Sequence, residues 1–308
     1  MAEYYTLGAS LPTLRPDDLK TLGFTSWEFI DELKAQATSG DRKQIDLMLL
    51  PEDNRALLAL LRNDPIPEPR HPYAIGVDKL GALVNLLRSR EVDARDPFEI
   101  QEEVKKSDYP AYMIDFAREY LYDEVSQRPP EYFYEDILVN AYYDYVENKG
   151  NSFVRTWKAL EKNIILVLAA ITVKRFDLDA RKLIIGESEL VNLLRSGNWS
   201  DVSFLDEGDV ITEITRISEE DNLSQREHKI DDFKFRFLDN LTFADTFSIS
   251  AMLAYFEKLL ILERWSSLDR TVGETRFKEI VGNLNSEARE GLEEFRRNNK
   301  KANSGFRK

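Results

Sequence analysis

Apolar side chains recur every three or four residues along most of the chain, which is the spacing of helices that bury one face. Strict alternation of apolar and polar residues, the mark of half-buried strands, does not extend over four or more residues. The pattern therefore predicts an all-α fold. The expected helices cover 25–37, 41–50, 52–62, the stretch from 77 onwards, 97–105, 109–125, 131–148, 153–176, 187–194, 209–217, 223–240, 242–268 and 272–284.

Prolines divide this helical pattern. Pro51 predicts a break between two helices, because a proline lacks the amide hydrogen and clashes with the preceding helical turn. Residues 64–73 contain four prolines in ten and predict a non-helical linker, which is the candidate for a lobe boundary in an otherwise single protein of 1–308. The segment from Tyr4 to Leu14 is short and mixed, and we expect it to be extended.

The strongest helical signal is 153–176, whose middle is apolar on all sides. Its uninterrupted apolar run, 164–173, is about half as long as the roughly twenty residues that a membrane-spanning helix needs. We therefore expect a helix buried at the centre of the fold and no membrane span. The N-terminus lacks the basic start and long apolar stretch of a secretory signal, so a cytoplasmic location is expected.

Aromatic residues gather in 109–125 and 131–148 and allow two interpretations. The rings could fill the contacts between helices, or they could form a tyrosine-rich face for a protein partner, with Tyr142 and Tyr143 as candidates. Trp265, near the end of the last long helix, is likewise either a core residue or an interface anchor. These three residues are the candidate protein-interaction sites.

The charge balance argues against one class of partner. Lys and Arg number 42 against 56 Asp and Glu, so the formal net charge of −14 repels phosphate backbones, and we expect no nucleic-acid partner. The exception is 286–308, a charged segment that we expect to be flexible and whose cations could contact an acidic partner or lipid headgroups. Its basic residues near the end are Arg296, Arg297, Lys300, Lys301, Arg307 and Lys308.

Motifs for catalysis or cofactor binding are missing. The sequence has no cysteine, and its two histidines, His71 and His228, lie in the proline-rich linker and in a highly charged helix, where His228 could pair with Asp231 or Asp232. No HExxH, GxxxxGK[ST], GxGxxG, GxSxG or Glu-x-x-His pattern occurs. We therefore expect no catalytic, cofactor or metal site from sequence motifs, although folding could still bring two carboxylates together as an acid–base pair.

The order of aromatic and helical features resembles a known family. The chain resembles a small family of uncharacterised bacterial proteins encoded alongside V/A-type ATPases, which look like divergent relatives of the C-type subunit of those ATPases, the one called d in eukaryotes. The resemblance covers about 4–285 and rests on helical periodicity with scattered aromatics. The segments that carry it are YYTLGASLP, YPAYMIDFAREYLYDEV, NAYYDYV, NSFVRTWKALEKNIILVLAAITVKRF and SISAMLAYFEKLLILERWSSLDRTVGETRFKEIV.

This resemblance implies a non-catalytic, elongated or funnel-shaped protein of three pseudo-repeated helical lobes, which serves ion transport and ATP synthesis as a socket between two other components. It implies that the partners are the central stalk and the membrane rotor ring, which would hold the protein at the inner face of the cell membrane. Two alternatives come from the residues alone. One is a helical scaffold or regulatory module unrelated to the ATPase that binds a protein through 109–145, and the other is an enzyme with a cross-helix carboxylate pair.

Overall fold

The computed structural model describes residues 4–16, 25–90, 109–122, 133–197 and 208–268. Within these ranges every regular element is a helix and no strand occurs, which confirms the all-α prediction. The expected helices 97–105 and 272–284 and the tail 286–308 lie outside the described residues. The helices are α1 Tyr5–Ser10, α2 Ser26–Gln36, α3 Ser39–Arg62, α4 Val77–Arg90, α6 Ala111–Tyr122, α7 Tyr134–Lys149, α8 Ser152–Phe176, α9 Ala180–Leu183, α10 Glu189–Ser196, α11 Gly208–Ser218, α12 Leu223–Thr242 and α13 Ile249–Leu268.

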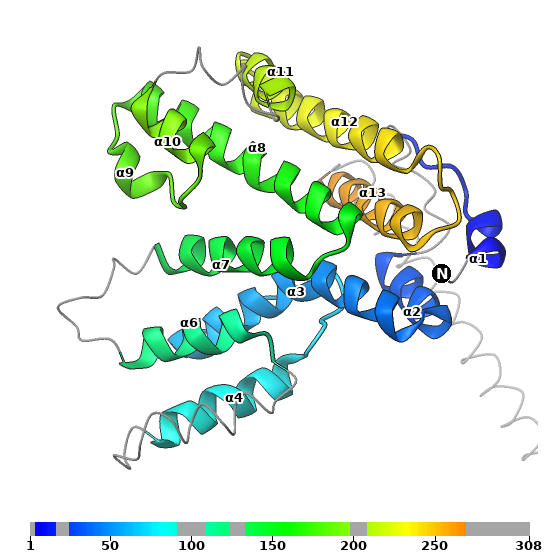
Figure 1. The fold of residues 1–308 in the computed structure, drawn as a ribbon, viewed down its shortest axis with the longest axis horizontal. Helices are drawn as coiled ribbons and strands as arrows, with labels where there is room; N and C mark the ends of the chain where they lie inside the picture. The colour runs from blue at the N-terminus through cyan, green and yellow to red at the C-terminus, as the bar shows by residue number, and fades with distance from the viewer. Residues whose placement is uncertain (1–3, 17–24, 91–108, 123–132, 198–207, 269–308) are drawn as a thin grey trace, which may run out of the picture.

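The helices pack in two groups that meet along α8 (Figure 1). In the first group, α3, α4, α6 and α7 pack against one another. In the second group, α11 lies on α8 and on α12, α12 packs against α13, and α13 carries α2 on another side. Because α7 also packs against α8, the two groups share one continuous hydrophobic core.

Helix α8 is the central element, as its apolar sequence predicts. The Asn151 side chain caps its first turn by accepting a hydrogen bond from the amide of Val154 at 2.9 Å. Successive turns then bury Trp157, Ile164 and Val167 against both groups of helices. One flank stays open, because Ile165 is 51% exposed.

The first turn of α2 joins the N-terminal region to the last described helix. Thr25 and Glu28 form a reciprocal capping box, in which the Glu28 amide donates to Thr25 at 3.2 Å and the Thr25 amide donates to Glu28 at 2.8 Å. The next residue, Ser26, donates from its amide and its hydroxyl to the carboxylate of Glu263 at 2.7 and 2.6 Å. A residue on α13 therefore fixes the start of α2.

Helix α3 continues through Pro51, so the predicted break at this proline is wrong. Proline has no amide hydrogen for the carbonyl four residues earlier, which here is the carbonyl of Leu47. The Tyr142 hydroxyl of α7 donates to that oxygen at 3.0 Å in the buried core. A tertiary hydrogen bond thus replaces the missing helical one, and the helix does not need to end.

The predicted extended conformation of Tyr4–Leu14 is wrong for its first part, because Tyr5–Ser10 forms α1. This short helix is held by tertiary contacts. The Tyr4 amide donates to the carbonyl of Phe247 at 2.8 Å, and the Tyr4 hydroxyl donates to Asp41 at 2.8 Å. Gly8 lies so close to Phe247 that an added Cβ would come within 2.9 Å of the ring, so this position requires glycine.

The proline-rich segment 64–73 is non-helical, as predicted, and it connects two helices that pack together, α3 and α4. The carboxylate of Asp53 holds its far end by accepting from the amides of Ala74, Ile75 and Gly76 at 2.7, 3.0 and 2.9 Å. Burial raises the pKa of Asp53, against these three donors, which favour the charged form. A lobe boundary at 64–73 stays a prediction.

Helix α13 begins at Ile249, seven residues after the start that the sequence pattern predicts. Residues 243–248 form turns between α12 and α13, and the Ser248 hydroxyl accepts from the amide of Ala251 at 3.3 Å, which caps the first turn of α13. Because a side chain starts α13 separately, the apolar pattern of 242–268 spans the end of one helix and the whole of the next.

Candidate binding groove

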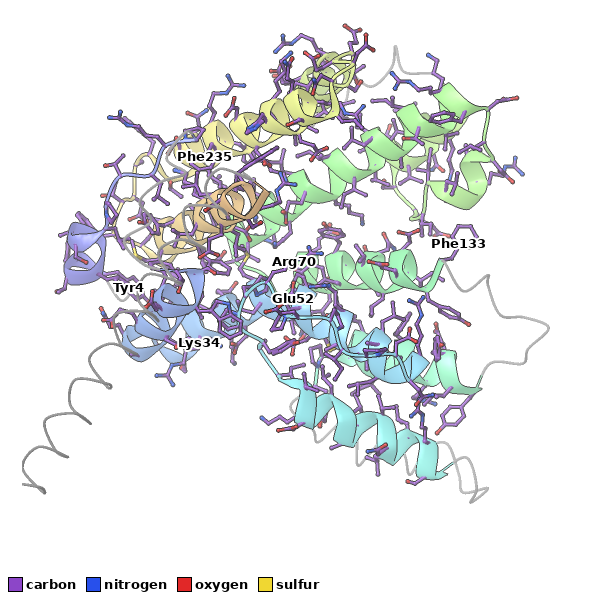
Figure 2. The ribbon with its side chains drawn as sticks, turned by 180° about the vertical axis from the view of Figure 1, so that it is seen from behind. Tyr4, Lys34, Glu52, Arg70, Phe133 and Phe235 are labelled. Carbon is purple, nitrogen blue, oxygen red and sulfur yellow. The ribbon has the colours of Figure 1, made fainter. Side chains whose placement is uncertain are left out.

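A groove of about 1180 Å³ runs between the two groups of helices. Helices α3 and α7 with the proline-rich segment form one wall, and α8, α12 and α13 form the other. Its lining mixes apolar side chains such as Leu58, Val139 and Ile261 with carboxylates and cations in nearly equal number. Figure 2 labels two of these charged residues, Glu52 and Arg70, next to each other in the middle of the molecule.

The most buried charges in the groove form one cluster. Lys158 of α8 is buried and contacts two carboxylates, Glu161 at 2.8 Å and Glu257 of α13 at 3.2 Å. Lys234 of α12 lies 3.9 Å from the other oxygen of Glu161. Two lysines and two carboxylates from three helices therefore compensate one another, and we call these four residues the charge cluster.

The two carboxylates of the charge cluster differ in their electrostatic environment. Burial favours the neutral form of Glu161, but Lys158 and Lys234 outweigh it and lower its pKa. Burial raises the pKa of Glu257, which has a single lysine contact to offset it. Burial also acts to lower the pKa of Lys158, yet the two carboxylates hold that pKa well above its ordinary value.

The proline-rich segment brings a second set of polar groups to the groove. Buried Glu52 binds Arg55 at 2.6 Å and lies 3.9 Å from Arg70. His71 is buried with its ring edge against Phe256, at 5.7 Å between ring centroids, and its Nδ1 donates to the carbonyl of Pro72 at 3.0 Å. Burial lowers the pKa of His71, so the neutral ring is favoured.

Both candidate tyrosines lie at the groove, and their rings are 5.4 Å apart. Tyr142 is fully in the core, where its hydroxyl serves the Pro51 turn of α3. Tyr143 is partly buried, lines the groove, and has a pKa raised well above its ordinary value by burial. Packing explains Tyr142, whereas Tyr143 presents part of its surface to the groove.

Trp265 lies between α12 and α13 and does not line the groove. Its indole nitrogen donates to Asp231 at 2.6 Å, and its ring stacks on His228 at 3.5 Å between centroids. Arg264 binds the same carboxylate. Asp231, which the sequence offered as a partner for His228, therefore binds Trp265 and Arg264. Whether Trp265, Tyr142 or Tyr143 contacts a partner protein stays a prediction.

Sequence reasoning missed Lys158, Glu161 and Glu257. A signal exists, because each is a charged residue within a strongly apolar helix, in WKALEKNIILVL and AYFEKLLIL. Sequence alone does not show that these charges face one another across helices.

Two searches limit what the described residues offer. No group of three or more histidine, aspartate or glutamate side chains in the described ranges could hold a metal ion. Over the same residues, no helix has both the length and the apolar character needed to cross a bilayer.

The fold and the groove define an all-α protein with a charge-compensated cleft between two helical groups. The chain belongs to a family described as "Protein of unknown function (DUF2764)", whose model matches residues 1–288. No curated protein and no solved structure matches it significantly.

Proposed function

We propose that this protein is a non-catalytic adaptor of a V/A-type rotary ATPase, which couples the central stalk to the membrane rotor ring. The resemblance of the sequence to proteins encoded with these ATPases names the complex. One structural observation supports an adaptor role, namely that the groove is lined by charges that are already paired with each other. In this proposal the protein is cytoplasmic and is held at the inner face of the membrane through its partners.

Paired charges suit a surface that binds a protein segment. An unpaired buried charge would have to be neutralised by the ligand, whereas a compensated groove loses little when a partner removes its water. The apolar side chains between the pairs, such as Leu58 and Ile165, supply the area that drives association. We therefore propose that a helical segment of the central stalk lies in this groove.

The groove also suits transmission of torque. Its walls are joined by contacts among α7, α8 and α13, which include the buried charge cluster and the contact between Ser26 and Glu263. Such contacts resist movement of one wall relative to the other, because breaking them leaves charges buried without a partner. A coupling element requires this stiffness.

Co-purification tests the adaptor role. The tagged full-length protein is isolated from its own host under mild conditions, and bound proteins are identified by mass spectrometry. The proposal expects the central-stalk and rotor-ring proteins to be enriched over an untagged control. Enrichment of an unrelated protein without the ATPase would favour the helical scaffold or regulatory module instead.

One observation favours a second candidate, an acid–base enzyme. Glu161 and Glu257 converge in the groove with pKa values displaced in opposite directions, which is typical of paired catalytic carboxylates. Lys158 lies in contact with both, so it occupies the position that a reacting atom would need. The adaptor is therefore preferred. Conversion of a compound in a metabolite extract by the wild type, but not by Glu161→Gln, would support the enzyme.

A further inference from the structure

The far end of α8 carries an apolar and basic turn that the groove does not use. This end, with α9 and α10, lies at the opposite side of the molecule from α1 (Figure 1). Asp177 ends the helix in the left-handed region, at φ 50°, and the amide of Leu178 donates back to the carbonyl of Val173 at 3.0 Å. The turn is therefore fixed by its own backbone hydrogen bond.

Two large apolar side chains project from this turn. Phe176 is 65% exposed and Leu178 is 45% exposed, although they are only two residues apart. Neither contributes to the hydrophobic core. Exposed apolar side chains that lie together are typical of a contact surface.

The charge around these two residues is opposite to that of the whole chain. Residues 174–182 contain four cations, Lys174, Arg175, Arg181 and Lys182, and two carboxylates, Asp177 and Asp179, whereas the full chain has a net charge of −14. A locally positive surface with projecting Phe and Leu side chains has the chemistry of proteins that lie on anionic lipid.

We propose that the turn between α8 and α9 contacts an anionic phospholipid surface, with Phe176 and Leu178 entering the headgroup region and Arg175 and Arg181 binding lipid phosphates. The turn projects at the end of the longest helix and does not form a groove, so it fits a broad deformable surface. This contact is independent of the adaptor proposal, and the failure of either leaves the other standing.

The acidic remainder of the molecule does not prevent this contact. At physiological ionic strength, exposed charges farther than about 8 Å from a lipid phosphate are largely screened. The turn can therefore meet the lipid while the more acidic surfaces stay farther away. The same screening means that high salt weakens the attraction, which gives the proposal a measurable signature.

Vesicle co-sedimentation of the purified full-length protein tests the proposal. We expect binding to vesicles of phosphatidylcholine with about one-third phosphatidylglycerol, little binding to phosphatidylcholine alone, and a strong loss at about 0.5 M salt. The double variant Phe176→Ser/Leu178→Ser should bind about tenfold or more weakly. The double variant Arg175→Glu/Arg181→Glu should also lose binding, since it reverses the local charge.

A matched control is Phe243→Ser. Phe243 is 86% exposed on the turn after α12, but its charged neighbours in sequence, Asp239 and Asp245, are acidic. This variant should bind vesicles like the wild type, and unchanged circular dichroism melts would show that all variants fold. Absence of wild-type binding, or equal loss in Phe243→Ser, would overturn the proposal. Full binding by Phe176→Ser/Leu178→Ser would also overturn it, since another surface, such as the basic tail, would then be responsible.

Discussion

At the scale of single residues, this structure depends on polar groups that find their partners on distant helices. The Leu47 carbonyl, left without its helical donor by Pro51, is satisfied by Tyr142, which lies 95 positions away in the sequence. Lys158 is paired across helices with Glu257, 99 positions away. Buried groups of this kind cost about 1–3 kcal/mol each when they lose their partner, so each pair can be tested by substitution.

The hydrogen bond to the Leu47 carbonyl should be measurable by a double-mutant cycle. Tyr142→Phe removes the donor and should lower the free energy of unfolding by about 1–3 kcal/mol. Pro51→Ala restores the amide hydrogen for the same carbonyl, so the cost of Tyr142→Phe should shrink in that background. Urea denaturation of the four proteins measures this coupling, and an equal cost in both backgrounds would disprove this role for Tyr142.

The charge cluster should behave as a buried network. Lys158→Met leaves Glu161 and Glu257 facing each other without their shared cation, and should cost about 3–5 kcal/mol. The control is Lys162→Met on the same helix. Lys162 pairs with exposed Asp144 at 3.0 Å, so its loss should cost less than about 1 kcal/mol. Thermal and urea unfolding compare the two variants, and similar costs would contradict a buried network.

At the scale of elements, the proline-rich segment is a packed connection. Asp53 binds the amides at its end, and His71 is buried against Phe256 of α13, so the segment joins α3 to both groups of helices. Because His71 is buried with its neutral form favoured, this connection should weaken when the ring takes up a proton.

The pH dependence of stability tests this point. Burial holds the pKa of His71 below 6.5, the value of an exposed histidine, so the unfolded chain binds a proton that the folded chain does not. Stability should therefore fall as the pH drops below about 6.5, by at most about 1.4 kcal/mol per pH unit from this group. Glu52, Lys158 and Arg70 face the ring and modulate the effect.

The variants His71→Leu and Phe256→Leu separate the titration from the packing. His71→Leu should flatten the loss of stability between pH 7 and pH 5.5, as measured by urea denaturation at each pH. Phe256→Leu removes the ring contact but keeps the histidine, so its stability should be lower while its pH dependence persists. An unchanged slope in His71→Leu would show that other groups govern this range.

The sequence predicts elements better than their connections. Periodicity places α8 at the centre, because ten consecutive apolar residues need burial on every side. The errors at Pro51 and at α1 share one cause. Local rules forbid a helix through proline or favour an extended N-terminal segment, but contacts from Tyr142 and Phe247 override them. Such contacts join residues far apart in sequence, so no local pattern contains them.

The candidate site was predictable only in part, for the same reason. Tyr142 and Tyr143 were identified by their aromatic clustering, and both reach the groove. The charge cluster requires three helices to meet, and neither the spacing nor the composition of any one helix encodes that meeting.

At the scale of the whole molecule, two proposed contact surfaces lie at different places. The groove between the two groups of helices is the proposed site for the central stalk, and the turn at the end of α8 is the proposed contact with anionic lipid. A protein with both could connect a rotating shaft to a structure at the membrane. The groove matters most, because its occupant determines whether the protein belongs to the ATPase.

Site-specific photo-crosslinking in the native host identifies the occupant of the groove. A benzophenone amino acid replaces Ile165, which is half-exposed and lines the groove, or Leu223, which is exposed outside it, and captured proteins are identified by mass spectrometry. We predict that the position of Ile165 captures a central-stalk protein of the V/A-type ATPase and that the position of Leu223 does not. Capture of no ATPase protein from the groove, or of the same one equally from both positions, would contradict the adaptor role.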